Sequence, residues 1–279
     1  MTPHGQPWPP TTQDLETEDR TLTIDGVRLP ARWLRPLPAR AGAPVLVFLH
    51  EGLGSIGLWK DFPEALCRAT GLPGFVYERQ GHGGADPLPR WPRRVGYLEE
   101  QADTVLPQVL AAAGIETFVH VGHSDGGSIA LLHAALRPPG LVGAITEAAH
   151  VFVEDITLAG IRAARVAYQE ADLKPRLERW HGPNTEGVFW GWNATWLEPA
   201  FAAWTMLNRL PAIRCPLLVL QGADDEYGSP AQVEAIAQGT GGPAIPLLIS
   251  DCGHVPHHQA RAAVIDAITP FVQGLETPV

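Results

Sequence analysis

A serine with a glycine two positions before it and another two positions after it lies in the stretch Gly122-His123-Ser124-Asp125-Gly126. An apolar run, FVHV, precedes this stretch, and a helical pattern, SIALLHAAL, follows it. A sharp turn from strand to helix can hold a nucleophile in a strained backbone conformation, but side chains at the two glycine positions would collide with the flanking elements. The pattern therefore predicts that Ser124 is a nucleophile for covalent acyl transfer.

Such a nucleophile needs donors for the oxygen that becomes negative during attack. The helix after Ser124 directs its N-terminal amides toward the reacting carbon, so the backbone N–H of Asp125 is the first expected donor of an oxyanion hole. The second is expected from the loop LHEGLGS, where glycines let the backbone approach closely.

A general base is expected near the end of the chain, in the stretch ISDCGHVPHH. His254 follows the last apolar strand, which puts it at the same edge of a parallel sheet as Ser124. We interpret His254 as the base. We expect its neighbours His257 and His258 at the surface, at the start of the last helix.

Three consecutive acids, Asp224, Asp225 and Glu226, lie in the stretch VLQGADDEYG. A Ser-His pair needs a carboxylate that orients the imidazole, and in an α/β fold this group comes from the loop after a neighbouring strand. The chain between this loop and His254 has room for one helix and one strand. The spacing supports the loop as the source of the acid, but it does not choose among the three residues.

The elements that must position these residues form an α/β pattern, with strands expected at residues 20–24, 27–34, 45–49, 74–77, 118–121, 141–146, 217–220 and 245–249. Helices are expected at 59–69, 97–113, 128–136, 230–238 and 259–272, an alternation that is typical of a parallel sheet with helices on both faces. Between about 151 and 210 the strand pattern stops and the chain becomes helical. We therefore expect a flexible N-terminal tail at 1–19, a core in two parts at 20–150 and 211–279, and a helical cap at 151–210.

Composition limits the class of partner. The net charge of -10 and the absence of a basic cluster argue against nucleic acid and against an anionic membrane surface, because either would need a Lys/Arg surface. The first residues show no secretory pattern and no long apolar run occurs, so we expect a cytoplasmic protein with a small-molecule substrate. Cys67, Cys215 and Cys252 lack the spacing of a metal or redox site, and we expect no metal.

The motifs GHSDGG, DDEYG and CGHVPH, in this order, resemble the α/β-hydrolase superfamily and specifically its small-capped serine hydrolases. The resemblance covers about residues 20–274. It implies a mostly parallel eight-stranded sheet, a helical cap inserted after the sixth strand, and a Ser-Asp-His triad. In that family the acid usually stands three positions after the glycine that ends the seventh strand, here Gly222, which implies Asp225 as the third member beside Ser124 and His254.

The same resemblance bears on two further loops. The family's oxyanion motif is H-G-x, with the amide of x as donor; here His50-Glu51-Gly52 matches it, so the N–H of Gly52 is implied as the second donor. The stretch 78–85 departs from the family's D-x-R-G-x-G-x-S pattern, and we interpret it as structural. Branches of the family that hydrolyse epoxides or remove halogens use an Asp nucleophile, which Ser124 argues against. Attack by water on an acyl-enzyme requires neither a metal nor an organic cofactor.

The substrate pocket is expected beneath the cap. Five of the nine tryptophans lie in the helical segment, and as a group they suggest an apolar or aromatic substrate, although each could instead pack the cap onto the core. They are Trp180, Trp190, Trp192, Trp196 and Trp204. Our candidate substrate-binding residues are Glu51, Trp59, His123, His150, Trp192 and Trp196.

The sequence therefore predicts a serine hydrolase that cleaves a carboxylic ester, with thioesters and lactones included. A hydrolase of carbon-carbon bonds in vinylogous diketones would use the same triad and a similar cap. A ligand-binding receptor on the same scaffold is the alternative from a different class.

Overall fold

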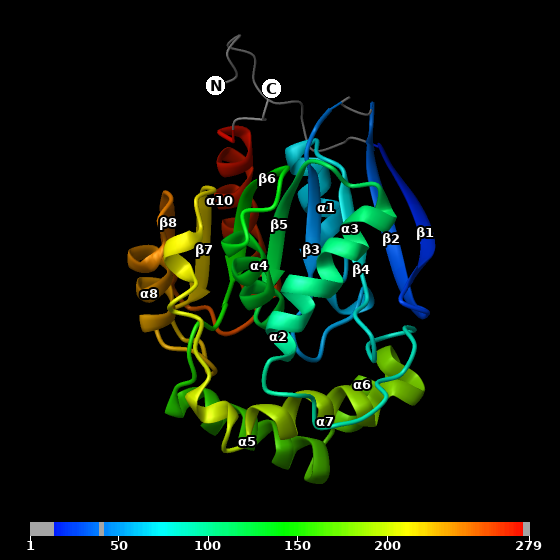
Figure 1. Ribbon diagram of the computed structural model, residues 1–279, viewed down its shortest axis with the longest axis vertical. Helices are drawn as coiled ribbons and strands as arrows, with labels where there is room; N and C mark the ends of the chain where they lie inside the picture. The colour runs from blue at the N-terminus through cyan, green and yellow to red at the C-terminus, as the bar shows by residue number, and fades with distance from the viewer. Residues whose placement is uncertain (1–13, 39–41, 276–279) are drawn as a thin grey trace.

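The computed structural model describes residues 14–38 and 42–275, which form one eight-stranded sheet with helices on both faces (Figure 1). The strand order is β1-β2-β4-β3-β5-β6-β7-β8. β1 and β2 pair antiparallel, as do β2 and β4, and every other pairing is parallel. The strands are β1 (Asp14–Ile24), β2 (Val27–Leu37), β3 (Val45–Leu49), β4 (Gly74–Tyr77), β5 (Phe118–His123), β6 (Leu141–Glu147), β7 (Leu217–Gly222) and β8 (Ala244–Ile249). The predicted α/β class with a mostly parallel sheet is confirmed.

The edge strand β1 begins earlier than expected. It starts at Asp14 rather than Arg20, so residues 14–19 belong to the sheet and the predicted tail boundary at residue 19 is wrong. Residues 1–13 lie outside the described residues. The added part of the strand is polar and exposed, and cross-strand ion pairs join Glu18 to Arg35 at 2.6 Å and Asp19 to Arg32 at 2.7 Å. A strand of this kind lacks the apolar alternation by which strands are recognised in a sequence.

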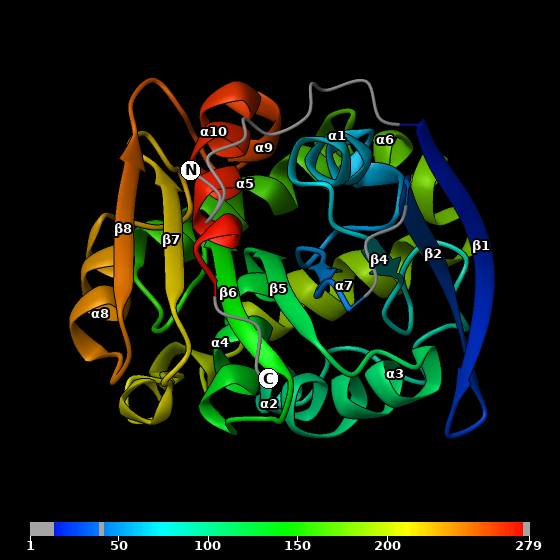
Figure 2. The same ribbon diagram turned by 90° about the horizontal axis from the view of Figure 1, so that it is seen from above.

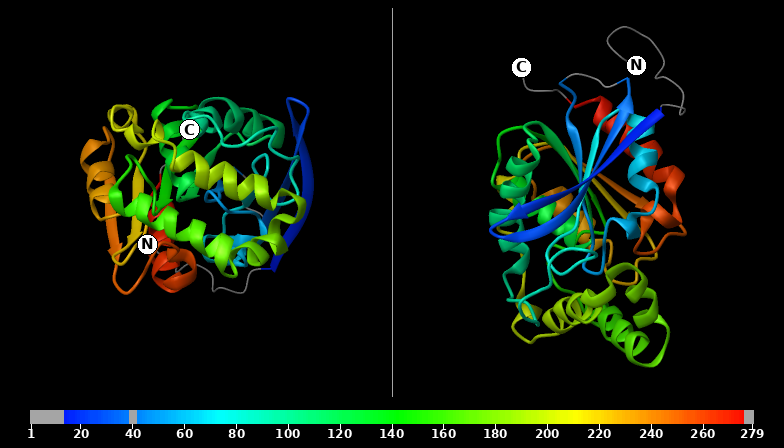
Figure 3. Two further views of the ribbon diagram at one scale, coloured as in Figure 1. Left: turned by 90° about the horizontal axis from the view of Figure 1, so that it is seen from below. Right: turned by 90° about the vertical axis from the view of Figure 1, so that its right-hand side faces the viewer.

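Helices cover the two faces of the sheet (Figures 2 and 3). The sheet thus separates two apolar clusters, one on each face. The helices α1 (Phe62–Thr70) and α10 (Arg261–Gln273) enclose one apolar cluster, which includes Leu66 and Ile268. On the other face lie α3 (Leu106–Ala113), α4 (Asp125–Ala135) and α8 (Ala231–Gly239), around a second cluster that includes Ile129 and Ile236. The inner strands β5 and β7 are buried along their whole length because both faces are covered.

The helix expected at 97–113 is interrupted. It consists of α2 (Tyr97–Glu100), a π-helical turn η2 (Gln101–Val105) and α3. Pro107 has no N–H for the helical hydrogen-bond ladder, which explains why the regular pattern gives way just before it. The short helix α9 (Pro256–Gln259) precedes α10, so the final helical segment also has two parts.

Between β6 and β7 the chain forms α5 (Asp155–Glu170), α6 (Leu173–His181) and α7 (Thr185–Trp196), which lie together beyond one end of the sheet (Figure 1). Where the chain leaves and re-enters the core, the two segments lie side by side. Phe152 and Thr205 form an isolated β-bridge, and the N–H of Met206 donates to the carbonyl of Val151 at 2.9 Å. We call this pair of segments, 151–153 and 204–206, the stem of the cap. No helix in the described ranges is long and apolar enough to cross a membrane.

Candidate active site

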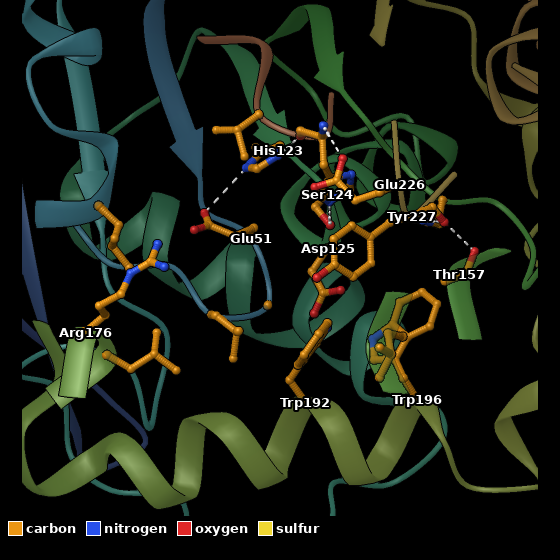
Figure 4. A pocket seen from close by; sticks show the side chains of 18 residues that line it. Glu51, His123, Ser124, Asp125, Thr157, Arg176, Trp192, Trp196, Glu226 and Tyr227 are labelled. Carbon is orange, nitrogen blue, oxygen red and sulfur yellow. Dashed lines mark hydrogen bonds and ion pairs between the residues drawn. The ribbon is translucent and has the colours of Figure 1, made fainter. Parts of the chain in front are cut away.

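Ser124 occupies the turn between β5 and α4, with φ 51° and ψ -118°. A positive φ is strained for a residue with a side chain, and here the surrounding structure holds it. The N–H of Ser124 donates to the carbonyl of Glu147 at the end of β6, at 2.8 Å. The turn thus anchors the serine to the neighbouring strand and leaves its side chain at the edge of a cavity (Figure 4).

The two glycines that flank the serine are required by close packing. A Cβ on Gly122 would overlap the carbonyl oxygen of Gly126, and a Cβ on Gly126 would overlap the carbonyl oxygen of Leu49. Neither neighbour is a flexible side chain that could move aside. These contacts are the collisions that the glycine spacing predicted.

Ser124, His254 and Asp225 form a chain of hydrogen bonds. The Ser124 hydroxyl lies 3.0 Å from Nε2 of His254, and Nδ1 of His254 lies 2.8 and 3.0 Å from the two carboxylate oxygens of Asp225. With Nδ1–H donating to the carboxylate, Nε2 of the neutral ring is free to accept the serine proton. The structure therefore brings together the three side chains that the sequence singled out.

Asp225 is held as an anion by its surroundings. Burial acts to raise the pKa of this carboxyl, but the hydrogen bond and charge of His254, together with the N–H of Tyr227 at 2.8 Å, hold its pKa below the ordinary value. A second backbone N–H, from Gly228, approaches the same oxygen at 3.3 Å. The carboxylate is thus fixed in the orientation in which it contacts the imidazole.

The other two acids of the loop differ from each other. Asp224 is exposed. Glu226 is also exposed, but its Oε2 accepts a hydrogen bond from the backbone N–H of His254 at 3.1 Å, and it lines the cavity. Sequence reasoning missed this contact, because the adjacency of two acids does not show that the second one turns back toward the histidine loop.

The two expected oxyanion donors, Gly52 and Asp125, both line the cavity beside Ser124. Among the described residues, neither backbone N–H donates a hydrogen bond, which leaves both free for a ligand. A Cβ on Gly52 would overlap the indole of Trp192, so the loop can approach the cap this closely only with glycine at that position.

The stretch 78–85 holds the oxyanion loop, residues 50–52, through hydrogen bonds from Arg79. The guanidinium of Arg79 donates to the carbonyls of His50 at 2.5 Å and Glu51 at 2.8 Å. Nδ1 of His50 donates to the carbonyl of Glu51 at 2.8 Å, and its Nε2 accepts the N–H of Arg79 at 3.1 Å. Burial lowers the pKa of His50, which matches a neutral ring in this role. These contacts agree with the interpretation of the stretch as structural.

The cavity has a volume of about 290 Å³ and lies between the core and the cap. Five of the six candidate substrate-binding residues line it. They are Glu51, His123, His150, Trp192 and Trp196. The cap also contributes residues that no sequence pattern marked, among them Thr157, Ile161, Arg176 and Leu177. Their helices follow an ordinary amphipathic pattern, and only the fold decides which face covers the cavity.

Trp59 does not line the cavity, and the expectation that it contacts substrate is wrong. Its side chain is 1% exposed and packs between Phe48, Phe62 and His257 in the core beneath α1. Trp59 ends a short 3-10 turn after the oxyanion loop, so its indole turns toward the core while the preceding Leu58 lines the cavity.

Three of the five cap tryptophans also serve packing. Trp180 lies against the backbone of Gly57, where a Cβ would overlap its ring. The indole N–H groups of Trp190 and Trp204 donate to glutamates at 2.8 and 2.9 Å. Only Trp192 and Trp196 face the cavity, so the pocket is less aromatic than the composition of the cap suggests.

His257 corrects the expectation of a surface position. It is 2% exposed, and its N–H and Nδ1 lie 2.9 and 3.1 Å from the same oxygen of Glu147, a fully buried carboxylate at the end of β6. Burial acts to raise the pKa of Glu147, but the charge and hydrogen bonds of His257 hold it below the ordinary value. The pair ties the segment after His254 to the strand that anchors Ser124.

His123 bridges the oxyanion loop and the histidine loop. Its Nε2 donates to the carbonyl of His254 at 2.8 Å, and its Nδ1 lies 3.5 Å from Oε2 of Glu51. Burial lowers the pKa of His123, but the Glu51 carboxylate more than offsets it and the pKa is raised. His150 differs, since burial lowers its pKa to about 4 and its Nε2 donates to the carbonyl of Tyr227 at 3.1 Å. In the described part of the chain, no group of three or more His, Cys, Asp and Glu side chains could hold a metal ion.

Comparison with known proteins decides the family. The model of the alpha/beta hydrolase family matches residues 46–267, which is most of the chain. This protein belongs to the alpha/beta hydrolase family. The matched residues include the turn at Ser124, the loop at Asp225 and the loop at His254. The cavity described above therefore lies within the part of the chain that belongs to the family.

Curated relatives of this hydrolase-fold chain include 2-succinyl-6-hydroxy-2,4-cyclohexadiene-1-carboxylate synthases. The protein from Enterobacter sp. (strain 638) is 31% identical over 164 residues, 59% of this chain and 56% of the relative. One from Salmonella paratyphi A is 31% identical over 182 residues, 64% of each chain. The chain thus spans less than two thirds of the length of these relatives.

Solved structures give a wider alignment. VinJ superposes with a TM-score of 0.71 at 25% identity, over 93% of this chain and 99% of that one. The enol-lactonase from Burkholderia xenovorans LB400 gives a TM-score of 0.69 at 17% identity, over 91% and 99%. The proline iminopeptidase from Mycobacterium smegmatis gives 0.69 at 19%, over 91% and 97%. At these lower identities the likeness shows the hydrolase fold alone.

Proposed function

We propose that this protein is a serine hydrolase that cleaves a carboxylic ester, thioester or lactone of a small substrate through an acyl-enzyme. The observation that carries the proposal is the hydrogen-bonded chain from Ser124 through His254 to Asp225, at the edge of a cavity lined by Gly52 and Asp125. Within the described residues, the backbone N–H groups of Gly52 and Asp125 donate no hydrogen bond. The combination supplies a nucleophile, a base with a fixed tautomer and an anion-binding site.

In this mechanism Ser124 Oγ attacks the carbonyl carbon while its proton moves to Nε2 of His254. The carbonyl oxygen becomes negative and accepts hydrogen bonds from the N–H groups of Gly52 and Asp125. The alcohol then leaves with the proton from His254, and the acyl group stays on Ser124. Water then attacks this ester and gives a proton to His254. The bond from the acyl carbon to Ser124 Oγ breaks, His254 returns the proton to Oγ, and the acid product leaves. Asp225 orients His254 throughout and stabilises its charged form.

The cavity limits the size and character of the substrate. Its volume of about 290 Å³ suits a small molecule, and Trp192 and Trp196 provide apolar walls beside the nucleophile. Ile161 and Leu177 extend the apolar lining from the cap. We therefore propose a substrate with an apolar or aromatic part.

Labelling with a fluorophosphonate tests the nucleophile. We expect one adduct on Ser124 of the folded protein, none on S124A, and turnover of 4-nitrophenyl esters that S124A lacks. The absence of an adduct on folded wild-type protein would overturn the proposal and favour a ligand-binding receptor on the same scaffold. An adduct with ester turnover at least 100 times slower than carbon-carbon cleavage of a vinylogous diketone would assign the triad to that reaction instead.

The curated relatives favour one other activity, that of the synthase. The product in their name carries succinyl and carboxylate groups, which calls for cationic side chains in the pocket. Here Glu51, Asp125 and Glu226 line the cavity, against one guanidinium, that of Arg176. This balance disfavours a dianion. Formation of 2-succinyl-6-hydroxy-2,4-cyclohexadiene-1-carboxylate by the purified protein, faster than any ester turnover, would reverse our choice.

A further inference from the structure

The side chain of Tyr227 has no role in the mechanism above, although it lies beside His254. The centroids of the two rings are 4.7 Å apart, and Tyr227 lines the cavity. In Figure 4 the tyrosine ring extends from the loop after β7 toward Ser124 and Asp125. No sequence motif marked this residue, which is the second after Asp225. Its position next to the reacting groups calls for an explanation.

Three hydrogen bonds fix the backbone of Tyr227. Its N–H donates to the carboxylate of Asp225 at 2.8 Å. Its carbonyl accepts hydrogen bonds from Nε2 of His150 at 3.1 Å and from the hydroxyl of Thr157 at 2.6 Å. Thr157 belongs to the cap helix α5, whereas Asp225 belongs to the core. The point from which the tyrosine ring projects is therefore held by both parts of the protein.

The ring of Tyr227 is enclosed between the core and the cap. His254 lies against it on the core side, and the ring of Trp192 lies 6.4 Å away, centroid to centroid, on the cap side. A Cβ on Gly160 of α5 would overlap the tyrosine ring, so α5 can pack this closely only with glycine at that position. Packing on several sides thus sets the direction of the ring.

The hydroxyl group at the end of this ring is unpaired and accessible. It makes no hydrogen bond within the described residues, and it is not among the buried polar atoms that lack a partner. The other three tyrosines of the chain differ, since the hydroxyls of Tyr77 and Tyr168 are buried and that of Tyr97 donates to Asp125. Only the Tyr227 hydroxyl is therefore available to a molecule in the cavity.

The charges near this hydroxyl indicate what it can bind. Burial, together with the charges of Glu226 and Asp225, raises the pKa of Tyr227 to about 12, so the hydroxyl stays protonated and can donate a hydrogen bond. Its partner is then an acceptor. The carboxylates of Glu51 and Glu226 line the same cavity and would repel an anionic acceptor. An uncharged oxygen satisfies both conditions.

We propose that the Tyr227 hydroxyl is a substrate-binding group that donates a hydrogen bond to an uncharged oxygen acceptor, such as an ether oxygen, near the scissile carbonyl. The proposal rests on the proposed hydrolase function. The acceptor must be near the carbonyl because the Tyr227 ring lies against His254, which contacts the Ser124 hydroxyl. Tyr227 thereby selects substrates that contain this oxygen over hydrocarbon substrates of the same shape.

Three esters that differ at one atom test the selection. Butyl 3-phenylpropanoate is the reference. Butyl phenoxyacetate has an oxygen in place of one CH2 group of the acyl part, and 2-methoxyethyl 3-phenylpropanoate has one in the alcohol part. Titration of the released acid gives kcat/KM for each. We expect the ratio of at least one ether ester to the reference to be about threefold or more higher in wild type than in Y227F, as a hydrogen bond between neutral groups provides. The ester that shows this effect identifies the part of the substrate that carries the acceptor.

The comparison of ratios removes two other influences. The intrinsic reactivity of each ester is the same for both enzymes, and a ratio within one sample does not depend on the fraction of protein that is folded. Y77F, which removes a buried hydroxyl on β4 in the core, is the matched control and should keep the wild-type ratios.

Equal ratios in wild type and Y227F for both ether esters would overturn the proposal and leave Tyr227 a packing residue. The absence of a fluorophosphonate adduct on Ser124 of wild-type protein would instead overturn the hydrolase function itself.

Discussion

The Glu226 carboxylate accepts a hydrogen bond of 3.1 Å from the backbone N–H of His254, while the preceding residue, Asp225, holds the ring of the same histidine. Two adjacent acids thus fix one histidine at two points. Asp225 sets the tautomer and direction of the imidazole, and Glu226 sets the position of the loop that carries it. The two contacts make different predictions.

Removal of the Glu226 contact should move the histidine loop without changing its chemistry. We expect E226A to lower kcat about tenfold, because one backbone donor loses a charged acceptor. E226Q keeps an oxygen acceptor in place and should lose less than E226A. Steady-state kinetics on the best ester, with thermal unfolding as a check on folding, measures both. Equal activity of E226A and wild type would show that the loop is held without this contact.

The ring contact of Asp225 should matter far more. In D225N the amide can present the wrong group to Nδ1, and the ring can then take the tautomer that leaves Nε2 unable to accept a proton. We expect a loss of kcat of about 10³- to 10⁴-fold, and less than a threefold change in D224N. Comparison of the two kcat values checks the assignment. A larger loss in D224N than in D225N would place the acid one residue earlier.

The two tryptophans Trp59 and Trp192 should separate stability from substrate binding. Trp59 is buried in the core, so W59A should lower the free energy of unfolding by about 3–5 kcal/mol. Trp192 lines the cavity, so W192A should raise KM for an aromatic ester with a smaller effect on Tm. Thermal unfolding and ester kinetics on both variants test this contrast. A raised KM in W59A with an unchanged Tm would contradict the core position of that ring.

Acid should destabilise the protein through buried neutral histidines. Burial lowers the pKa of His133 and of His150 to about 4, below the ordinary value of 6.5. Between pH 6.5 and 4 the unfolded chain therefore binds more protons at these positions than the folded chain, and the stability that is present above pH 6.5 is lost as the pH falls toward 4.

The variant H133N isolates one of these groups. Nδ1 of His133 lies 2.8 Å from Nε2 of His120, and an asparagine side chain keeps a hydrogen-bonding group near that position without titrating in this range. We expect its free energy of unfolding to decrease less steeply than that of wild type, by up to about 1.4 kcal/mol per pH unit. Denaturant titrations at pH 4.5, 5.5 and 6.5 measure the slopes. Parallel slopes would mean that His133 is protonated equally in the folded and unfolded chains.

Most of the fold could be predicted from the sequence, since the strands β3 to β8 are apolar runs, largely buried in β3 to β7, and begin and end within two residues of their expected bounds. The arrangement of Ser124, Asp225 and His254 could be predicted because parallel strands bring their carboxyl ends to one edge of the sheet. The start of β1 could not, because its stability comes from pairing with β2 and from ion pairs across the hairpin rather than from an apolar face.

The parts of the site that could not be predicted depend on the direction in which a side chain points, and the local sequence does not determine this direction. His257 is a polar residue near the start of a helix, where the sequence suggests a surface position. Only the fold brings the buried carboxylate of Glu147 next to it. Trp59 and Leu58 are neighbours in sequence, yet one faces the core and the other the cavity. Arg176 lies on a cap helix whose orientation over the sheet is set by tertiary packing.

The stem of the cap has a consequence for how this protein could change. The bridge between Phe152 and Thr205 and the bond from Met206 to Val151 close the insertion at its base, next to the sheet. When the ends of a loop are held together, lengthening the loop adds only a small entropic cost. The whole segment between the two strands of the stem can therefore be exchanged as a cassette, by evolution or by engineering, for one with another lining. Substrate preference can diverge in this way while Ser124 and His254 keep their positions.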